Sequence, residues 1–209
     1  MVKVIVTGAG GKMGSRIIGM ISAMEELRVV GAIEVKGHPI IGRDLGHSLG
    51  AGRTGALVSD SLADCIDQAD VVIDFTDHEA SLTYLKIASE KNRAIVIGST
   101  GFTAEEMATA RRLAEKTRCV LSPNMSVGVN VMLKVLEYCA GILYEDYDVE
   151  IVEAHHHLKK DAPSGTALML ADAMCKEIDH PMKYEYDRHA KREKRTRDEI
   201  GIHAVRGGT

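Results

Sequence analysis

The beginning of the chain constrains its fold most, because a short apolar strand there leads directly into glycines that open a helix. Val2–Thr7 is a β-branched run, which is typical of a buried strand. Residues 12–25 follow with a helical period. The apolar face predicted for this helix carries Met13, Ile17, Ile18 and Ile21. A strand, a glycine turn and a helix in this order are typical of the first unit of a nucleotide-binding α/β sheet.

The same alternation continues through the first part of the chain. Further buried strands are predicted at residues 28–34, 71–75, 94–97 and 119–122, and helices at residues 78–91 and 103–116. Alternating strands and helices predict an α/β fold with a doubly wound, Rossmann-type parallel sheet covered on both faces. The glycine-rich residues 37–55 are predicted to form a loop beside the nucleotide.

The pattern changes after Pro123. Helices are predicted at residues 127–143 and 164–178, and strands at residues 147–156 and 200–205. Residues 183–198 are highly charged with little periodicity, and the basic residues 188–197 within them are predicted to form a solvated loop. The strand at 200–205 has no evident partner in the chain. We therefore expect residues 1–126 to form a dinucleotide-binding domain and residues 127–209 a second, α+β domain.

Composition limits the function classes. The 209 residues are 45% hydrophobic, which suits one large or two small packed domains. The net charge of −4 argues against a nucleic-acid or membrane-surface protein. No apolar run approaches the roughly 20 residues that span a bilayer. The four cysteines form no C-x-x-C pair and the first strand starts at Val2, so we expect reduced thiols, no targeting peptide and a cytoplasmic protein.

The glycine loop predicts a dinucleotide site. Its glycines let the backbone approach a pyrophosphate, and the helix start supplies free N–H groups for the charge. Glu34 ends the second strand, twenty residues after Gly14, where a carboxylate can accept both ribose hydroxyls. The predicted contacts are Gly8, Ala9, Gly10, Gly11, Lys12, Met13 and Glu34.

The cofactor is predicted to be NADH or NADPH. Glu34 would repel a 2′-phosphate, which favours NADH, and Val35 offers no charge. Lys36 could offset that repulsion as a 2′-phosphate contact, so we expect dual use with NADH at least as good.

Two further turns follow predicted strands and are expected to contact the nicotinamide. They lie at the carboxyl ends of parallel strands, where ligands bind in open α/β sheets. Their residues are Gly98, Ser99 and Thr100 in one turn and Ser122, Pro123, Asn124 and Met125 in the other. The alternative is that both are ordinary strand-to-helix connections.

The segment from Glu153 to Thr166 contains the most residues suited to proton transfer and anion binding. Ser164 after Pro163 is a helix-start signal, so the N–H groups of Gly165 and Thr166 are expected to form a carboxylate nest. Lys159 adds a point charge for a carboxylate, and a histidine titrating near neutral pH can donate a proton.

The triple histidine His155, His156 and His157 does not predict a metal site. Neighbouring residues on a strand point to opposite faces and cannot converge on one ion, and no Cys, Asp or Glu partners lie at ligand spacing. On the strand alternation, His155 and His157 share one face and His156 takes the other. Surface histidines without a role are the remaining alternative.

Together these stretches resemble the dihydrodipicolinate reductase family of lysine and diaminopimelate synthesis. The matching motifs are Gly8-Ala-Gly-Gly-Lys-Met-Gly14, Asp74-Phe-Thr76, Gly98-Ser-Thr-Gly-Phe102, residues 122–130 and residues 153–166. The resemblance implies NAD(P)H-dependent reduction of 4-hydroxy-tetrahydrodipicolinate, through dihydrodipicolinate, to tetrahydrodipicolinate. It also implies a homotetramer, with residues 127–209 as the domain for substrate binding and oligomerisation.

The resemblance further assigns roles to individual residues. His155 is implied to be the acid, and Lys159 a proton donor or substrate binder. The residues implied to hold the dicarboxylate substrate are His156, Lys159, Gly165 and Thr166. His157 receives no role.

Two features depart from the family pattern. Many NADPH-using members carry an arginine at the position of Val35. Family chains also continue past the residue that matches Thr209, so we expect the second domain to be incomplete at its C-terminus.

Three other functions are weighed against this one. Another amino-acid dehydrogenase of the same two-domain plan would not need the His-His-x-x-Lys and Ser-Gly-Thr arrangement, and a non-catalytic dinucleotide sensor would need neither a proton donor nor a carboxylate nest. The basic residues 188–197 could suggest nucleic-acid binding, but they include no stacking aromatic side chain.

Overall fold

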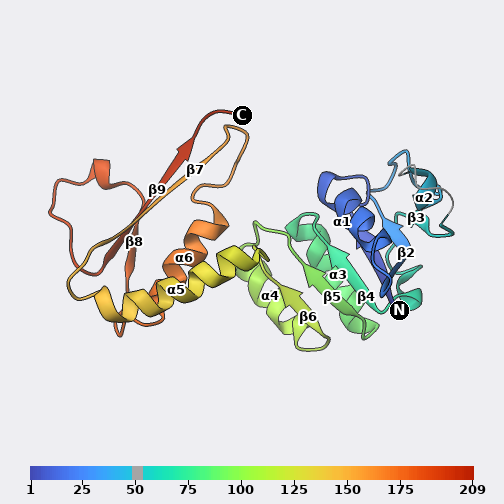
Figure 1. The fold of residues 1–209 in the computed structure, drawn as a ribbon, viewed down its shortest axis with the longest axis horizontal. Helices are drawn as coiled ribbons and strands as arrows, with labels where there is room; N and C mark the ends of the chain where they lie inside the picture. The colour runs from blue at the N-terminus through green and yellow to red at the C-terminus, as the bar shows by residue number, and fades with distance from the viewer. Residues whose placement is uncertain (49–53) are drawn as a thin grey trace. The chain divides into compact units, whose positions relative to one another are not determined.

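The computed structural model describes residues 1–48 and 54–209, and their contacts divide the chain into two units, Met1–Pro123 and Asn124–Thr209. The first unit is built on one six-stranded sheet (Figure 1). Its strands are β1 (Val2–Thr7), β2 (Leu27–Ile33), β3 (Leu57–Ser59), β4 (Val71–Asp74), β5 (Ala94–Ile97) and β6 (Cys119–Leu121). Its helices are α1 (Lys12–Ser22), α2 (Leu45–Ser48), α3 (His78–Glu90) and α4 (Ala104–Ala114), with a 3₁₀ turn at Ile66–Gln68.

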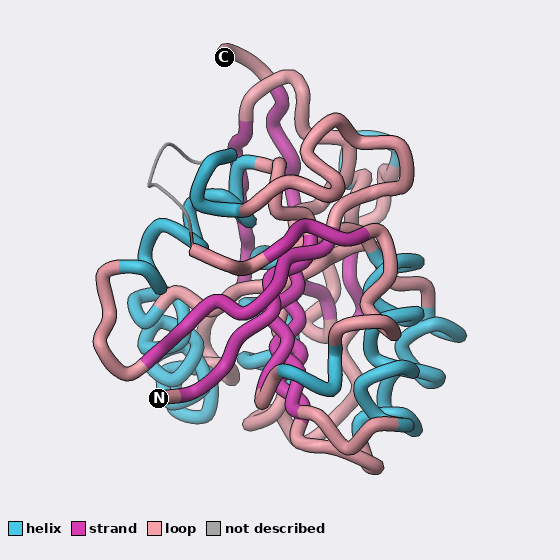
Figure 2. The backbone as a smooth tube through the Cα atoms, turned by 90° about the vertical axis from the view of Figure 1, so that its right-hand side faces the viewer, coloured by secondary structure: helices cyan, strands magenta, loops and turns pink. Residues whose placement is uncertain are grey.

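The strand order of this sheet is β3-β2-β1-β4-β5-β6, and neighbouring strands pair in parallel. The strands are magenta in Figure 2 and twist relative to one another, as neighbouring strands of a sheet do. The order reverses between β1 and β4, and this switch point is where doubly wound sheets bind their ligands. The predicted doubly wound parallel sheet is confirmed.

Successive residues of β1 pack against different layers. Val4 and Val6 join Ile18 and Ile21 of α1 in one buried cluster. Ile5 instead joins the cluster formed with α3 and α4. Both faces of the central strand are therefore covered, which explains why β1 reads as a continuous apolar run rather than an alternating one.

Parts of the prediction for this unit were wrong. The first helix ends at Ser22, because the N–H group of Val2 already pairs with the carbonyl of Glu26 and residues 23–26 form the turn into β2. Met13 is 49% exposed and lies off the buried face of α1. The predicted loop 37–55 contains α2, and β3 was missed because it has only three residues. Residues 49–53 of that loop lie outside the described residues.

The second unit combines two helices with a three-stranded sheet of order β7-β9-β8. Its elements are α5 (Val127–Leu143), β7 (Val149–His155), α6 (Gly165–Cys175), β8 (Lys183–Glu185), a 3₁₀ turn at Arg188–Ala190 and β9 (Glu199–Arg206). Ala167 and Ala171 of α6 pack on Ile200 and Ile202 of β9. The small alanine side chains let the helix lie close to the sheet.

The last strand is the centre of this sheet rather than an unpaired strand. β9 pairs in parallel with β7 on one side and with β8 on the other, so the expectation that it lacks a partner was wrong. β8 lies at the start of the charged residues 183–198, where no strand was predicted. Its charged ends concealed it, since Lys183 and Glu185 carry no apolar signal.

The charged segment is held to the sheet by ion pairs. Arg188 pairs with Glu199 and Lys191 with Glu185. Arg195 lies 3.0 Å from Asp148 and also pairs with Glu150. These acidic partners therefore neutralise much of the positive charge of the charged segment. A surface that binds phosphates instead presents its positive charge to the ligand.

Over the described part of the chain, no helix is both long and apolar enough to cross a membrane.

Candidate active site

The glycine loop turns where β1 ends and brings two stretches of backbone into contact. Gly8 has a φ of +63°, a conformation that L side chains rarely adopt. The N–H group of Gly11 donates to the carbonyl oxygen of Gly8 at 3.0 Å. A Cβ atom at Gly14 would lie 2.1 Å from that same oxygen. The loop therefore requires glycine at Gly14, which brings the first turn of α1 against β1.

The start of α1 leaves room for an anion. Its N-cap residue, Gly11, offers no side-chain cap, and the first turn carries no acidic residue. The N-terminal N–H groups and the helix dipole favour negative charge there. A loop of three glycines and one alanine that opens such a helix fits the pyrophosphate of a dinucleotide.

Glu34 lies against this loop, as its spacing predicts. One oxygen of its carboxylate accepts the N–H group of Gly10 at 2.7 Å, and the other accepts that of Val35 at 2.8 Å. Each oxygen has further acceptor capacity, which is the chemistry that two ribose hydroxyls need. Val35 is 68% exposed and Lys36 is also exposed beside it.

A buried carboxylate beneath the loop was given no role from the sequence. Asp74 is fully buried at the end of β4, and it accepts hydroxyl groups from Thr7 at 2.5 Å and Thr76 at 2.6 Å. Ser81 of α3 also bonds to Asp74 and lies 2.8 Å from Ser99. The network joins β1, β4, α3 and the turn after β5, so it fixes the predicted cofactor residue Ser99. The sequence offered one signal for this network, the motif Asp74-Phe-Thr76 at the end of a strand.

The Ser122–Met125 turn spans the boundary between the two units. The N–H group of Ser122 donates to the carbonyl of Ile97 in the first unit. Asn124 belongs to the second unit, where its side-chain amide donates to the hydroxyl of Thr166 at 3.1 Å. A predicted cofactor residue and a predicted substrate residue are thus in direct contact.

The half-buried face of β7 carries apolar side chains in its first part and ionisable side chains at its end. Val149 and Ile151 pack in the core, and Glu153 and His155 continue on the same half-buried face, while Val152 is 72% exposed on the other. Alternation along the strand therefore places Glu153 beside His155.

Glu153 is the centre of a hydrogen-bonded cluster. Its Oε2 lies 2.5 Å from Nδ1 of His155 and 2.8 Å from Nη1 of Arg206. Its Oε1 accepts Nη2 of Arg206 at 2.7 Å and the N–H group of Ser164 at 2.9 Å. The bidentate Arg206 pair, followed by the other donors, lowers the pKa of Glu153 to about 2.

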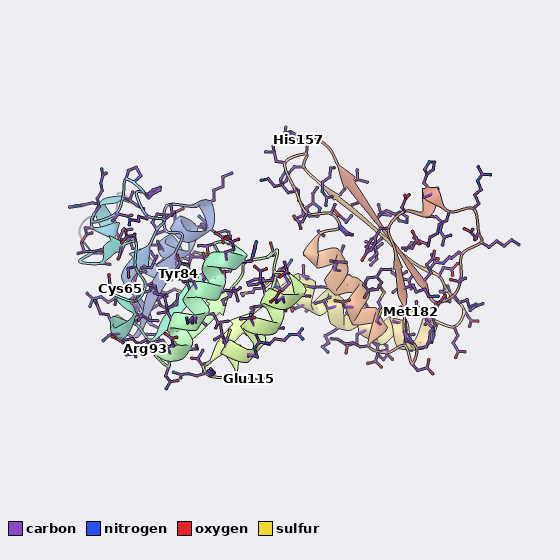
Figure 3. The ribbon with its side chains drawn as sticks, turned by 180° about the vertical axis from the view of Figure 1, so that it is seen from behind. Cys65, Tyr84, Arg93, Glu115, His157 and Met182 are labelled. Carbon is purple, nitrogen blue, oxygen red and sulfur yellow. The ribbon has the colours of Figure 1, made fainter. Side chains whose placement is uncertain are left out.

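The other two histidines lie beyond the strand, because β7 ends at His155. The predicted alternation of all three rings was therefore wrong for His156 and His157. His156 is exposed, and its carbonyl accepts the N–H group of Lys159 at 3.1 Å. His157, labelled in Figure 3, bonds to the carbonyl of Gly208 through its ring and its N–H group. It fastens this turn to the segment after β9.

Lys159 lies next to this cluster. Its ammonium group is 2.7 Å from Asp161, whose pKa it lowers. The carbonyl of Asp161 in turn accepts Nη2 of Arg206 at 2.6 Å. Lys159 and Arg206 thus give this region two cations around one short loop.

The start of α6 has the predicted geometry. Ser164 is the N-cap, and its hydroxyl accepts the N–H group of Ala167 at 3.2 Å. Gly165 and Thr166 are the first two helical residues, and the first turn carries no acidic side chain. Their N–H groups lie at the positive end of the helix dipole, where a carboxylate binds favourably.

Within residues 1–48 and 54–209, no group of three or more His, Cys, Asp or Glu side chains is placed to hold a metal ion. The site is therefore described by its anion-binding and proton-donating groups.

Comparison with known proteins gives one consistent family. The sequence model described as "Dihydrodipicolinate reductase, N-terminus" matches residues 2–125, and "Dihydrodipicolinate reductase, C-terminus" matches residues 128–209. A 4-hydroxy-tetrahydrodipicolinate reductase of Syntrophus aciditrophicus (strain SB) is 50% identical over 100% of this chain and 78% of its own. The reductase of Citrifermentans bemidjiense is 47% identical over 100% and 79%.

Solved structures agree with this assignment. A dipicolinate-bound dihydrodipicolinate reductase from Paenisporosarcina sp. TG-14 superposes with a TM-score of 0.70 at 28% identity, over 99% of this chain and 79% of that chain. An amine dehydrogenase from Mycobacterium smegmatis has a TM-score of 0.65 at 19% identity, over 87% and 63% of the two chains. The second likeness shows the shared fold alone.

Proposed function

The chain belongs to the dihydrodipicolinate reductase family and is a nicotinamide-dependent reductase of 4-hydroxy-tetrahydrodipicolinate, and we propose that His155 and Lys159 carry its chemistry. The product is tetrahydrodipicolinate, an intermediate of diaminopimelate and lysine synthesis. The observation that carries the proposed roles is the cluster of Glu153, His155 and Arg206 beside the start of α6.

Residues 1–126 are the proposed cofactor domain. When bound, the reduced nicotinamide supplies a hydride. The backbone of Gly8–Met13 would hold the pyrophosphate, Glu34 would accept the ribose hydroxyls, and the turns at Gly98–Thr100 and Ser122–Met125 would contact the nicotinamide. Glu34 accepts the N–H group of Gly10 at 2.7 Å, so a ribose bound at this loop would meet its negative charge, which disfavours a 2′-phosphate. Exposed Lys36 offsets this charge, so both NADH and NADPH are used.

Residues 127–209 are the proposed substrate and oligomerisation domain. The Gly165–Thr166 N–H groups bind one carboxylate, and Lys159 with His156 binds the other. The related Paenisporosarcina reductase was solved with dipicolinate, an aromatic dicarboxylate of similar shape, which supports this class of ligand. A homotetramer in the cytoplasm completes the proposal.

The proton needed for the reduction comes from His155. Loss of the 4-hydroxyl group as water precedes or accompanies the reduction, and the electron-rich centre formed then takes a proton. Lys159 stabilises the negative charge of the substrate during this step, because an ammonium group close to a carboxylate acts as a fixed point charge.

The test couples the preceding synthase to supply fresh substrate and follows oxidation of NADH and NADPH separately. We expect turnover with both cofactors. His155→Gln and Lys159→Ala should each lower kcat/KM by about 100-fold or more, as general acids contribute 10²- to 10⁴-fold, with cofactor Kd nearly unchanged. Lys160→Ala removes the neighbouring exposed lysine and should leave turnover intact.

Wild-type turnover in either active-site variant would overturn the role given to that residue. Binding of NADH without any turnover by the wild-type protein would favour the dinucleotide sensor.

A further inference from the structure

The four contacts of Glu153 differ in whether they can change from donor to acceptor. The Ser164 N–H group and both guanidinium nitrogens of Arg206 can only donate. The imidazole of His155 is the exception, because a neutral ring carries its proton on either nitrogen. An ionised carboxylate only accepts, so the nitrogen that faces it must carry the proton.

We infer that Glu153 is a positioning residue that keeps a proton on Nδ1 of His155, which leaves Nε2 as the atom that delivers a proton to the substrate. The inference rests on the proposed role of His155 as the acid. It goes beyond that role because it names the delivering atom and the residue that selects it.

The proton balance follows from this arrangement. The imidazolium form of His155 carries protons on both nitrogens. Its Nε2–H bond breaks, the proton forms a new bond at the electron-rich centre of the reduced substrate, and the bonding electrons remain on the ring. The neutral imidazole that results has its proton on Nδ1, where Glu153 already accepts it, so no rearrangement is needed. Solvent then returns a proton to Nε2.

Arg206 is what keeps Glu153 from taking the proton itself. Its two guanidinium N–H groups bind the two carboxylate oxygens at 2.7 and 2.8 Å, and the Glu153 side chain is only 8% exposed. A carboxylate held in this way remains an acceptor while the charge on its histidine neighbour changes.

Glu153 also has a structural part, because it ties the start of α6 to the sheet through Ser164 and Arg206. That part alone makes no difference to which nitrogen of His155 carries the proton. The tautomer therefore separates positioning from mere support.

Glu153→Gln tests the inference with little change in shape. If the amide NH₂ faces Ser164 and Arg206, it meets two donors. If it faces His155 instead, it meets only one Arg206 donor, and Nδ1 must become an acceptor. The second orientation has fewer clashes, so the variant should move the proton of neutral His155 to Nε2.

The matched control is Glu150→Gln, on the same strand but the other face. Glu150 lies 2.8 Å from Nε2 of His203 and pairs with Arg195, so this change also removes a carboxylate from a histidine and an arginine. It should leave both His155 and kcat unchanged.

The readouts are the ring ¹⁵N shifts of His155, measured by long-range ¹H–¹⁵N spectra at a pH that leaves the ring neutral, and steady-state kinetics. His155→Gln assigns the signal among the nine histidines. We expect the Nδ1–H form in the wild type and the Nε2–H form in Glu153→Gln. kcat of that variant should fall about 10- to 100-fold, part of the 10²- to 10⁴-fold that a positioned general acid contributes, and the Kd of the probe dipicolinate should change much less.

An Nε2–H form in the wild-type protein would overturn the inference, whether or not the variant folds. An unchanged Nδ1–H form in a folded Glu153→Gln protein would overturn it as well, without touching the proposed function. If the tautomer switched but kcat stayed at the wild-type value, the role of His155 as the acid would fall, and the inference with it.

Discussion

Two glycines of α1 show how differently a single methyl group can act within one helix. A Cβ atom at Gly14 would lie 2.1 Å from the carbonyl oxygen of Gly8, which belongs to the backbone and cannot move aside alone. At Gly19 the same atom would have nothing within 4 Å. Gly14 is therefore required by the close approach of α1 to the carbonyl oxygen of Gly8, whereas Gly19 only lowers the stability of the helix.

We therefore expect Gly14→Ala to weaken cofactor binding and Gly19→Ala to stabilise the fold. Gly14→Ala pushes α1 away from the loop and should weaken NADH binding at least tenfold, by our estimate of about 1.4 kcal/mol or more. Gly19→Ala should keep NADH affinity and raise the free energy of unfolding by about 0.5–1 kcal/mol. NADH titration and urea unfolding measure both quantities. Unaltered NADH affinity in Gly14→Ala would contradict the assignment of this loop to the cofactor.

Local spacing in the sequence predicts the contacts of some site residues but not those of others. Glu34 could be placed against the loop because strand, glycine turn and acidic residue follow one another at a known distance. The partners of Glu153 could not be predicted in the same way. Arg206 is brought to it by the pairing of β7 with β9, and no pattern near Glu153 indicates that pairing.

Helices α5 and α6 both have a serine as the N-cap residue, but only one of these serines forms a side-chain cap bond. The Ser164 hydroxyl accepts the N–H group of Ala167 and is buried, whereas Ser126 makes no side-chain cap bond. The cap at Ser164 satisfies the third N–H group of α6. The first two remain available for a carboxylate.

Ser164→Ala should therefore cost more than Ser126→Ala. Loss of a serine cap typically lowers the free energy of unfolding by about 1 kcal/mol, and the change at Ser126 should cost clearly less. Urea unfolding followed by circular dichroism compares the two variants. Equal losses would show that the Ser164 hydroxyl does not stabilise the helix start.

Element type was predictable where the apolar signal was unambiguous. α5 has the predicted bounds because its helical period extends over 17 residues, and β5 has them because it is a continuous apolar run of strand-forming residues. β3 and β8 were missed, since three residues are too few to show a period and β8 carries charges. β9 was found, but its central position depends on a neighbour that the sequence did not reveal.

Three carboxylates, distributed over both units, make the free energy of unfolding depend on pH in the acid range. The pKa is lowered to about 2 for Asp44 by the N–H group of Thr54, for Asp198 by Lys183, and for Glu153 by Arg206. The ordinary values are 3.8 for aspartate and 4.5 for glutamate. A carboxylate with a lowered pKa in the folded state stabilises that state above its ordinary value and loses the effect as the pH falls to the folded value.

The free energy of unfolding should therefore decrease as the pH falls from about 5 to about 2. Urea unfolding at a series of pH values measures the decrease. Glu153→Gln should show a smaller decrease over this window, because its amide does not titrate, while Glu150→Gln serves as the comparison. A free energy of unfolding that stays constant down to about pH 2 would contradict the lowered pKa values of these three carboxylates.

The position of β9 also sets an order for the synthesis of the protein. In the larger sheet each new strand joins an edge that earlier residues have already made: β2 joins β1, β3 joins β2, β4 joins β1, and β5 and β6 follow. In the smaller sheet β7 and β8 emerge from the ribosome first, and neither pairs with the other. Both edges stay open until β9 has been translated. The first unit can thus fold while the chain grows, whereas the hydrogen-bonded cluster of Glu153 can assemble only when Arg206 arrives with β9.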